Sequence, residues 1–352
     1  MKKIPCMLMR GGTSKGVFLL ADDLPQNIQE RDELILAIMG SGHALQIDGI
    51  GGGSPQTSKV AIISRSSHPD AEDIDYLFAQ VSITDRLVDT APNCGNILCA
   101  VGSYAIEKGL IPVTGDETII RIRNINTHTF VNATVQTPNG QVLYEGSTTI
   151  ASVPGQAAPI SLTFLNACGT KTGKLLPTGH EIDIFDGVEV SCIDMAMPVV
   201  LIDAPQLNKT GYETAEQLEA DETFMQRLES IRQQAGLAMG LGDVSQKVIP
   251  KPILVSPAIH GGTVNVRYFM PHKCHGALAV TGAIAIATGT ILENSVIKRY
   301  LSQKVDMQHI SIEHLSGHFD VSLNQRGHFP EGLQASIIRT ARKLFAGDVY
   351  VP

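Results

Sequence analysis

Two stretches of the chain decide the fold: Cys94–Ile111 (CGNILCAVGSYAIEKGLI) and Cys274–Ile291 (CHGALAVTGAIAIATGTI). They lie 180 residues apart, and seven of their eighteen aligned positions are identical. The identities fall at helical spacings, so we predict apolar helices over Asn96–Lys108 and Gly276–Ala287, each starting close to its cysteine. A helix that is apolar on every face is expected to be buried on all sides. The chain therefore contains two like halves, and we expect the two helix starts to face each other across a cleft.

The duplication continues outside these helices, with the order of the matching segments unchanged. Ser58–Ser64 (SKVAIIS) matches Pro250–Ser256 (PKPILVS), and Ile120–Ile125 matches Ile310–Leu315. Both halves are rich in short β-branched segments separated by Gly, Pro and Asn, which is typical of strands. We therefore predict an α+β fold of two pseudo-repeated domains, each a β-barrel-like sheet wrapped around its central apolar helix.

The domain boundary is expected near the Pro/Gly/Thr-rich connection 153–179, which gives domains 1–180 and 181–352. We expect the terminal strand of the chain to pack on the first domain. Apolar residues at three- and four-residue steps predict amphipathic helices over Thr214–Met239 and Leu333–Phe345. Val142–Tyr144 is expected to form a short strand.

Composition narrows the class of protein. The 352 residues are 43% hydrophobic and 18% charged, with a net charge of −8 and no cluster of Lys and Arg. Binding to nucleic acid or to an anionic membrane is therefore not expected. No stretch approaches the ~20 apolar residues of a membrane span, and the start does not resemble a signal peptide. We expect a cytoplasmic protein whose six cysteines, none in a CxxC pair, are thiols.

A first candidate motif is Arg10–Gly16 (RGGTSKG), a glycine-flanked polar segment before a strand. Its N–H groups and the hydroxyls of Thr13 and Ser14 could converge on a carboxylate or phosphate. The alternative is a solvated turn. A second motif, Gly49–Lys59, has three consecutive glycines, which serve a tight bend or a close approach to a ligand.

Lys59 stands where this second loop becomes a buried strand. Partial desolvation favours the neutral amine, which would make Lys59 a usable base. The alternative is an ordinary surface lysine at a strand end.

Pro92–Asn96 (PNCGN) opens the first apolar helix. A helix start favours a thiolate and binds oxyanions through its free N–H groups, here those next to Cys94 and Gly95. The amides of Asn93 and Asn96 could bind a substrate carboxylate or cap the helix. The alternative for Cys94 is a small buried cap residue, but a cysteine at the same place in both halves favours function.

His272–His275 (HKCH) invites a metal interpretation, yet the chain has no HExxH or CxxC to complete a site. We expect no metal. Cys274 and His275 are instead expected to face the substrate, with Arg267 aimed at a carboxylate. Ser316 and Gly317, in a matching loop, are weaker substrate-binding candidates.

With these residues identified, the chain resembles the PrpF-like family, most closely its 4-oxalomesaconate tautomerase (GalD-like) branch. The similarity runs essentially end to end. The matching stretches are Met9–Gly16, Asp48–Ile63 (DGIGGGSPQTSKVAII), Pro92–Asn96, Thr163–Gly173 (TFLNACGTKTG), Met195–Ile202 and Val266–His275 (VRYFMPHKCH). The resemblance implies a diaminopimelate-epimerase-like fold and a cofactor-independent isomerase. It also implies that Lys59 is the family's acid/base lysine and Cys94 its cysteine partner, while Cys274 aligns with the second cysteine of the epimerases.

The expected reaction is a 1,3-allylic proton shift or a keto–enol tautomerisation of a small unsaturated di- or tricarboxylic acid, such as 4-oxalomesaconate or methylaconitate. Lys59 and Cys94 exchange the proton, and N–H groups at the helix starts stabilise the dienolate. No cofactor is expected, and a homodimer is the expected assembly. Two alternatives stay open: an accessory protein that binds an aconitase-like dehydratase, and a two-cysteine racemase or epimerase. The expected substrate-binding residues are Thr13, Ser14, Asn93, Gly95, Asn96, Arg267, Cys274, His275, Ser316 and Gly317.

Overall fold

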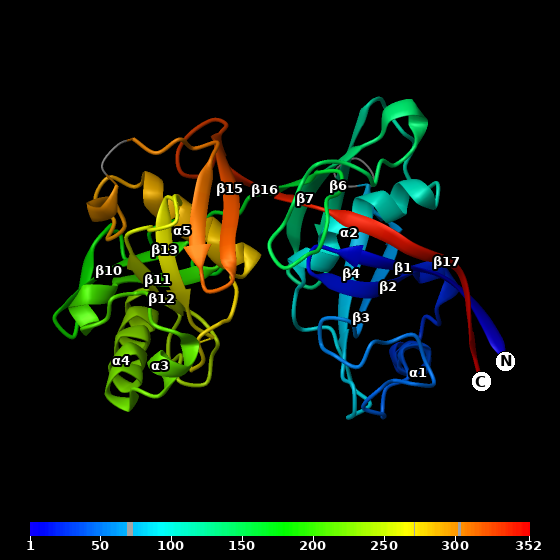
Figure 1. Ribbon diagram of the computed structural model, residues 1–352, viewed down its shortest axis with the longest axis horizontal. Helices are drawn as coiled ribbons and strands as arrows, with labels where there is room; N and C mark the ends of the chain where they lie inside the picture. Colours follow the sequence, from blue (N-terminus) through cyan, green and yellow to red (C-terminus); the bar gives the residue numbers. More distant parts are fainter. Residues whose placement is uncertain (69–72, 271, 302–303) are drawn as a thin grey trace. The chain divides into compact units, whose positions relative to one another are not determined.

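A computed structural model describes residues 1–68, 73–270, 272–301 and 304–352. The chain forms two compact units (Figure 1). The first comprises Met1–Leu165 together with Ile338–Pro352, and the second comprises Asn166–Ile337. The sequence placed the domain boundary between residues 180 and 181. No helix in the described part of the chain is long and apolar enough to cross a membrane.

The first unit wraps its strands around a central helix, α2 (Gly95–Glu107), most of whose residues are buried. Helix α1 (Ile28–Met39) packs its apolar face on the outer side of the sheet. The strands of this unit are β1 (Lys2–Gly11), β2 (Ser14–Leu20), β3 (Lys59–Arg65), β4 (Ile74–Val81), β5 (Val88–Asp89), β6 (Glu117–Asn124), β7 (Thr129–Gln136), β8 (Ile160–Leu165) and β17 (Ala341–Val351). Short 3-10 helices span Ala21–Asp23 and Pro138–Gly140.

The second unit has the same plan around α5 (Val280–Ile291), with α3 (Ala215–Glu219) and α4 (Glu222–Ala238) outside. Its strands are β9 (Asp183–Phe185), β10 (Val188–Asp194), β11 (Pro198–Asp203), β12 (Lys251–Ser256), β13 (Val264–Tyr268), β14 (Ile310–His314), β15 (Gly317–Gln325) and β16 (Leu333–Arg339). Short 3-10 helices span Ala204–Leu207 and Lys298–Tyr300.

The duplication extends to the strand pairing. In the first unit β1–β2 is antiparallel, β2–β3 parallel, β3–β4 antiparallel and β4–β6 parallel. In the second unit β10–β11, β11–β12, β12–β13 and β13–β14 repeat the same alternation in the same order. The repeat read from the sequence is therefore a repeat of topology, and it makes β12 the structural counterpart of β3.

The helix expected over Leu333–Phe345 is wrong, because this segment forms β16 and β17. Alternate residues of β16 are buried, as expected for a strand with one face in the core. The apolar spacing of this segment is compatible with either a helix or a strand. Strand pairing decides between the two, since β16 pairs with the preceding strand β15, and β17 pairs with the distant β1 along nearly its whole length. The terminal strand thus belongs to the first unit.

Three other expectations need correction. Helix α5 starts at Val280, because a loop that includes the bond from Ala277 N–H to His275 Nδ1 precedes it. The helix expected over Thr214–Met239 is two helices, since Asp221 caps a new start by accepting from Phe224 N–H. Val142–Tyr144 lies outside the strands.

Candidate active site

Lys59 is the first residue of β3, and its half-buried side chain lies on the face of the sheet that carries α2. Its Nζ donates a 2.6 Å hydrogen bond to Gln80 Oε1 and lies 5.2 Å from the centre of the Phe78 ring. Gln80 is opposite Lys59 in the β3–β4 register. The Gln80 amide cannot turn freely, because its Nε2 donates to Ser58 O at 2.9 Å and to Pro55 O at 3.1 Å.

Cys94 is the N-cap residue of α2, as its position in the PNCGN motif predicts. Its side chain is half-buried and caps no N–H group of the first turn. Those N–H groups therefore keep the positive end of the helix dipole available to an anion. The buried Tyr76 hydroxyl donates to Cys94 O at 3.4 Å and so ties the helix start to β4.

Lys59 and Cys94 belong to the same unit and the same side of its sheet. Tyr76, Phe78 and Gln80 alternate along β4, so their side chains share one face. Gln80 and Phe78 contact the Lys59 amine, and Tyr76 contacts Cys94. A single row of side chains therefore links the amine to the helix start that carries the thiol.

The Arg10–Gly16 segment forms the tight turn of the β1–β2 hairpin and sits on the first turn of α2. Asn96 Nδ2 donates to Thr13 Oγ1 at 3.0 Å, and Asn96 Oδ1 accepts from Thr13 N–H at 3.4 Å. Gly12 has φ +50°, and a Cβ there would lie 2.2 Å from Asn96 Oδ1, so only glycine fits. Thr13 is exposed and Ser14 is buried.

The chain around this turn holds it in place. Arg10 Nη1 donates to Gly12 O at 2.9 Å and to Thr340 O at 3.0 Å. Gly12 N–H also donates to Thr340 O, at 2.9 Å. The C-terminal segment therefore supports the turn that carries Thr13.

The three remaining candidates of the first unit differ in how many of their polar groups are already hydrogen-bonded within the protein. Asn93 Oδ1 accepts a 2.6 Å hydrogen bond from the buried Asn124, which positions the residue before Cys94. Asn96 is committed to the hairpin turn by the bonds above. Gly95 is the first helical residue, so its N–H is one of the free donors at the helix start.

The glycine-rich loop owes its glycines to contacts with its own chain. A Cβ on Gly49 would lie 2.2 Å from Gly40 N, and one on Gly51 would lie 2.4 Å from the Gln46 side chain. Gln46 is buried, and its Oε1 accepts from Gly53 N–H and from Ser58 Oγ. The loop thus fixes the backbone just before Lys59.

In the second unit Cys274 is not at a helix start, because α5 begins six residues later. It forms an isolated bridge with Phe269, and its N–H donates to Glu219 Oε1 at 2.9 Å. Burial raises the pKa of its thiol to about 11. Cys274 is therefore a thiol in a different setting from Cys94, because it is not the N-cap residue of the central helix of its unit.

Arg267 is buried, and much of its guanidinium already has acceptors. Its Nε donates to Glu213 O, and its Nη1 donates to Asn265 Oδ1 and Val266 O. Burial lowers the pKa of Arg267. If Arg267 binds a substrate carboxylate as expected, it does so through Nη2.

The last three candidates gather around one loop of the second unit. His275 Nδ1 accepts from Ala277 N–H, and the His275 ring packs edge-on against Tyr268. Burial lowers the pKa of His275. Ser316 Oγ donates to Gly276 O, and Gly317 follows with φ +129°. Pro271, inside the Val266–His275 motif, lies outside the described residues.

Among the described residues, no three His, Cys, Asp or Glu side chains gather in a way that could hold a metal ion. The Thr163–Gly173 motif instead surrounds a carboxylate of the chain itself. The buried Asp194 accepts from Thr170 Oγ1, Lys171 N–H and Thr172 N–H at 2.8–2.9 Å. This motif therefore has a structural role.

The sequence analysis missed the residues of β4 that surround the candidate pair. The signal that could have found Gln80, Phe78 and Tyr76 is their two-residue spacing in an apolar strand. Their assignment to Lys59 also needs the β3–β4 register, which the sequence does not display.

Comparison with known proteins agrees with this architecture. All 352 residues match the family described as PrpF protein. The chain is 62% identical over its full length to the Escherichia coli protein YbhH, and the match covers all of both chains. It is 49% identical to the 4-oxalomesaconate tautomerase of Pseudomonas putida, with 99% of this chain and 96% of that protein covered.

The crystal structure of a methylitaconate-delta-isomerase superposes with a TM-score of 0.90 at 33% identity. The match covers 99% of this chain and 96% of that one. The predicted α+β fold, with two diaminopimelate-epimerase-like repeats around central helices, is confirmed. The chain belongs to the PrpF family, and it is an isomerase.

Proposed function

We propose that this isomerase catalyses a 1,3-proton shift in a small unsaturated di- or tricarboxylic acid, with Lys59 and Cys94 as the acid/base pair. The observation that carries the proposal is the row Gln80–Phe78–Tyr76, which links the Lys59 amine to the start of α2. The substrates in the names of the relatives, 4-oxalomesaconate and methylitaconate, supply the class of acid.

The chemistry follows from the residue types. One of the pair removes a proton from a carbon activated by an adjacent carbonyl or double bond, and the C–H electrons pass into a dienolate. The free N–H groups at the start of α2 stabilise the negative charge as it develops. The other residue delivers a proton to the γ-carbon, so that one C–H bond breaks, another forms and no redox change occurs.

The second thiol fits this chemistry less well. A two-cysteine mechanism needs both sulfurs to ionise readily, yet burial raises the pKa of Cys274 to about 11 and Cys274 is not at the start of α5. The lysine–cysteine pair therefore supports an isomerase of unsaturated acids better than an amino-acid racemase. Thr13 and Asn93 are proposed to bind a carboxylate of the substrate, since both lie at the N-terminal end of α2.

Proton NMR in D₂O tests the proposal with 4-oxalomesaconate, methylaconitate and methylitaconate. The wild type should place deuterium on one carbon of at least one acid. Lys59→Met and Cys94→Ser should each lower kcat by about 10²–10⁴-fold, the usual contribution of a positioned acid or base. Cys99→Ser is the matched control, because that thiol lies one turn later and is fully buried. Turnover by Lys59→Met at the wild-type rate, or no turnover of any acid by the wild type, would refute the proposal.

A further inference from the structure

Lys251 is the counterpart of Lys59 in the second unit. Each is the first residue of its strand, and each strand pairs in parallel with the second strand of the preceding hairpin. Lys59 lies opposite Gly16, and Lys251 lies opposite Val199. The duplication therefore delivers a lysine to the same place in both units.

The Lys251 side chain is on the side of its sheet that carries α5. Lys251 and Ile253 are two residues apart, so they share a face of β12. Ile253 is opposite Tyr268, whose ring packs so closely on α5 that a Cβ on Gly282 would lie 2.4 Å from it. Lys59 has the equivalent relation to α2.

Lys251 is buried, at 2% relative exposure, and its amine has no hydrogen-bond or ion-pair acceptor among the residues that the structure describes. A buried ammonium without a counter-ion is unfavourable, so proteins seldom keep one without a use for it. Lys59 differs, because its amine has the Gln80 oxygen.

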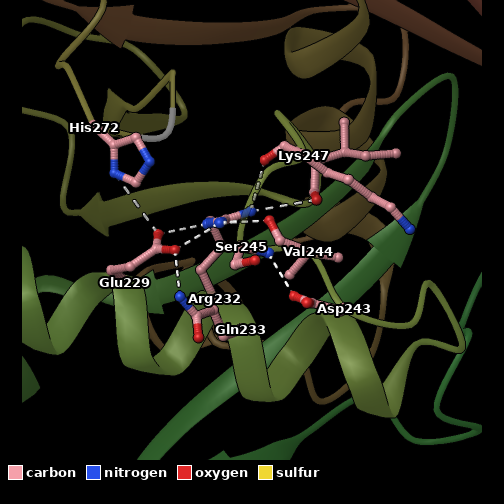
Figure 2. Close-up of polar contacts among 9 residues, drawn as sticks. Glu229, Arg232, Gln233, Asp243, Val244, Ser245, Lys247 and His272 are labelled. Atoms are coloured by element: carbon pink, nitrogen blue, oxygen red, sulfur yellow. Dashed lines mark hydrogen bonds and ion pairs between the residues drawn. The ribbon is translucent and has the colours of Figure 1, made fainter.

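The charged residues that the structure describes near Lys251 do not supply an anion for its amine. Arg232 is fully buried and takes both oxygens of Glu229, at 2.6 Å each, as Figure 2 shows. Its Nη1 also donates to Lys247 O and Ile249 O, which brings this cation close to Lys251. Glu229 is therefore already neutralised, and Arg232 adds positive charge at Lys251.

His275, in the HKCH loop, is a further ionisable group that interacts with Lys251. Burial is the main reason that the pKa of His275 is lowered, and the positive charge of Lys251 lowers it further. Glu219, the carboxylate at this loop, accepts from Cys274 N–H. Among the described residues, Arg232 and His275 are thus the ionisable groups that interact with Lys251, and neither is an anion.

We infer that Lys251 is a carboxylate-binding residue of the second unit, and that a polycarboxylic acid supplies the anion its buried amine lacks. The inference rests on the proposed function for the class of acid. It adds a binding residue that the motifs do not contain. The carboxylate would accept a charge-assisted hydrogen bond from Nζ, and no covalent step takes place.

Tricarballylate is the probe, because it carries three carboxylates but has no double bond to isomerise. Its dissociation constant is measured by calorimetry on the full-length wild type, Lys251→Met and Lys247→Met. Lys247 is the matched control, since its side chain is exposed and its amine donates to Leu241 O. Thermal midpoints are recorded for all three proteins.

We expect Lys251→Met to weaken tricarballylate binding at least tenfold and to raise the thermal midpoint, while Lys247→Met matches the wild type in binding. A lysine with a purely structural role would lower the midpoint when replaced. Equal affinity in the wild type and Lys251→Met, or no binding by the wild type, would overturn the inference. Lysine-dependent binding without turnover of any unsaturated acid would support this site and count against the proposed function.

Discussion

At the scale of single residues, the candidate site depends on how the Lys59 amine is held. Gln80 can only present its oxygen to Lys59, because its nitrogen is occupied by the carbonyls of Ser58 and Pro55. We therefore assign Gln80 a positioning role. Loss of about 1 Å of precision in a reacting group can lower a rate by about 10²-fold.

Gln80→Leu should lower kcat by about 10–100-fold with a small change in KM, because the amine loses its fixed direction. Gln80→Glu should instead shift the acidic limb of the pH–rate profile to higher pH if Lys59 is the base, since a carboxylate favours the protonated amine. Steady-state kinetics across pH measures both. Gln136→Leu, at a half-buried strand position of the same unit whose amide donates to Glu117, is the control. An unchanged pH profile in Gln80→Glu would show that Gln80 does not act on Lys59.

Residue-scale prediction from sequence succeeded where a motif is contiguous and failed where a partner comes from register. Cys94 at the start of its helix could be predicted from PNCGN alone. Gln80 lies 21 residues after Lys59 and becomes its neighbour only through the β3–β4 pairing. The sequence repeat aligns Lys251 with Lys59, but only the fold shows that Lys251 is buried without an acceptor among the described residues.

At the scale of elements, the β1–β2 turn and the start of α2 behave as one unit. Gly12→Ala must adopt a positive φ and must also displace Asn96, whose Oδ1 would lie 2.2 Å from the new Cβ. The left-handed backbone alone costs roughly 1–2 kcal/mol. Displacement of Asn96 also disturbs the helix start next to Cys94, so activity should fall along with stability.

Urea unfolding and kcat/KM test this coupling. Gly140→Ala is the control, because Gly140 has φ +77° but open space around its Cβ position. It should lose about 1–2 kcal/mol of stability and keep its kcat/KM. Equal losses of activity in the two variants, or no loss in Gly12→Ala, would show that the conformation of the β1–β2 turn does not affect the active site.

The elements also show why the sequence predicted some boundaries and not others. The helix α2 was predicted within one residue at each end, because its apolar pattern and its cap coincide. The segment 333–345 has apolar spacings that fit either a helix or a strand, and β1, the partner of its β17 part, lies more than 300 residues away in the chain. No local pattern contains that pairing, so the helix prediction was wrong.

At the scale of the whole molecule, the two units share one arrangement of strands around a central helix, but their side chains have diverged. One copy has a half-buried lysine with a polar acceptor and a cysteine at a helix start. The other has a buried lysine without one among the described residues, and a cysteine well before its helix. The fold could be predicted from the repeat because hydrophobic pattern survives divergence, whereas the chemistry of each copy could not.

The buried amine should leave a signature in the pH dependence of stability. Burial and Arg232 lower the pKa of Lys251 from 10.5 to about 8. Below pH 8 the amine is protonated in both the folded and unfolded states, and its burial costs up to about 3 kcal/mol. Between pH 8 and 10.5 the unfolded chain binds the proton that the folded protein has released, so this cost declines as pH rises.

Buried thiols act in the opposite direction. Burial raises the pKa of Cys99 to about 12 and that of Cys274 to about 11, so the unfolded chain releases these protons first. Their contribution to stability is complete below about pH 9 and declines above it. The wild type alone therefore shows a mixture of two opposing slopes, and only a difference between variants isolates Lys251.

Urea unfolding of the wild type, Lys251→Met and Lys247→Met under reducing conditions at pH 7, 8, 9 and 10 resolves that difference. Lys251→Met should be more stable than the wild type by up to about 3 kcal/mol at pH 7, and the gain should shrink toward zero as the pH approaches 10.5. The thiol contributions cancel because both proteins carry the same cysteines. Lys247→Met should differ from the wild type by a small amount that stays constant with pH. A Lys251→Met gain that does not change between pH 7 and 10 would mean that the pKa of the amine is the same in the folded and unfolded chain, which would contradict the burial of an unpaired charge.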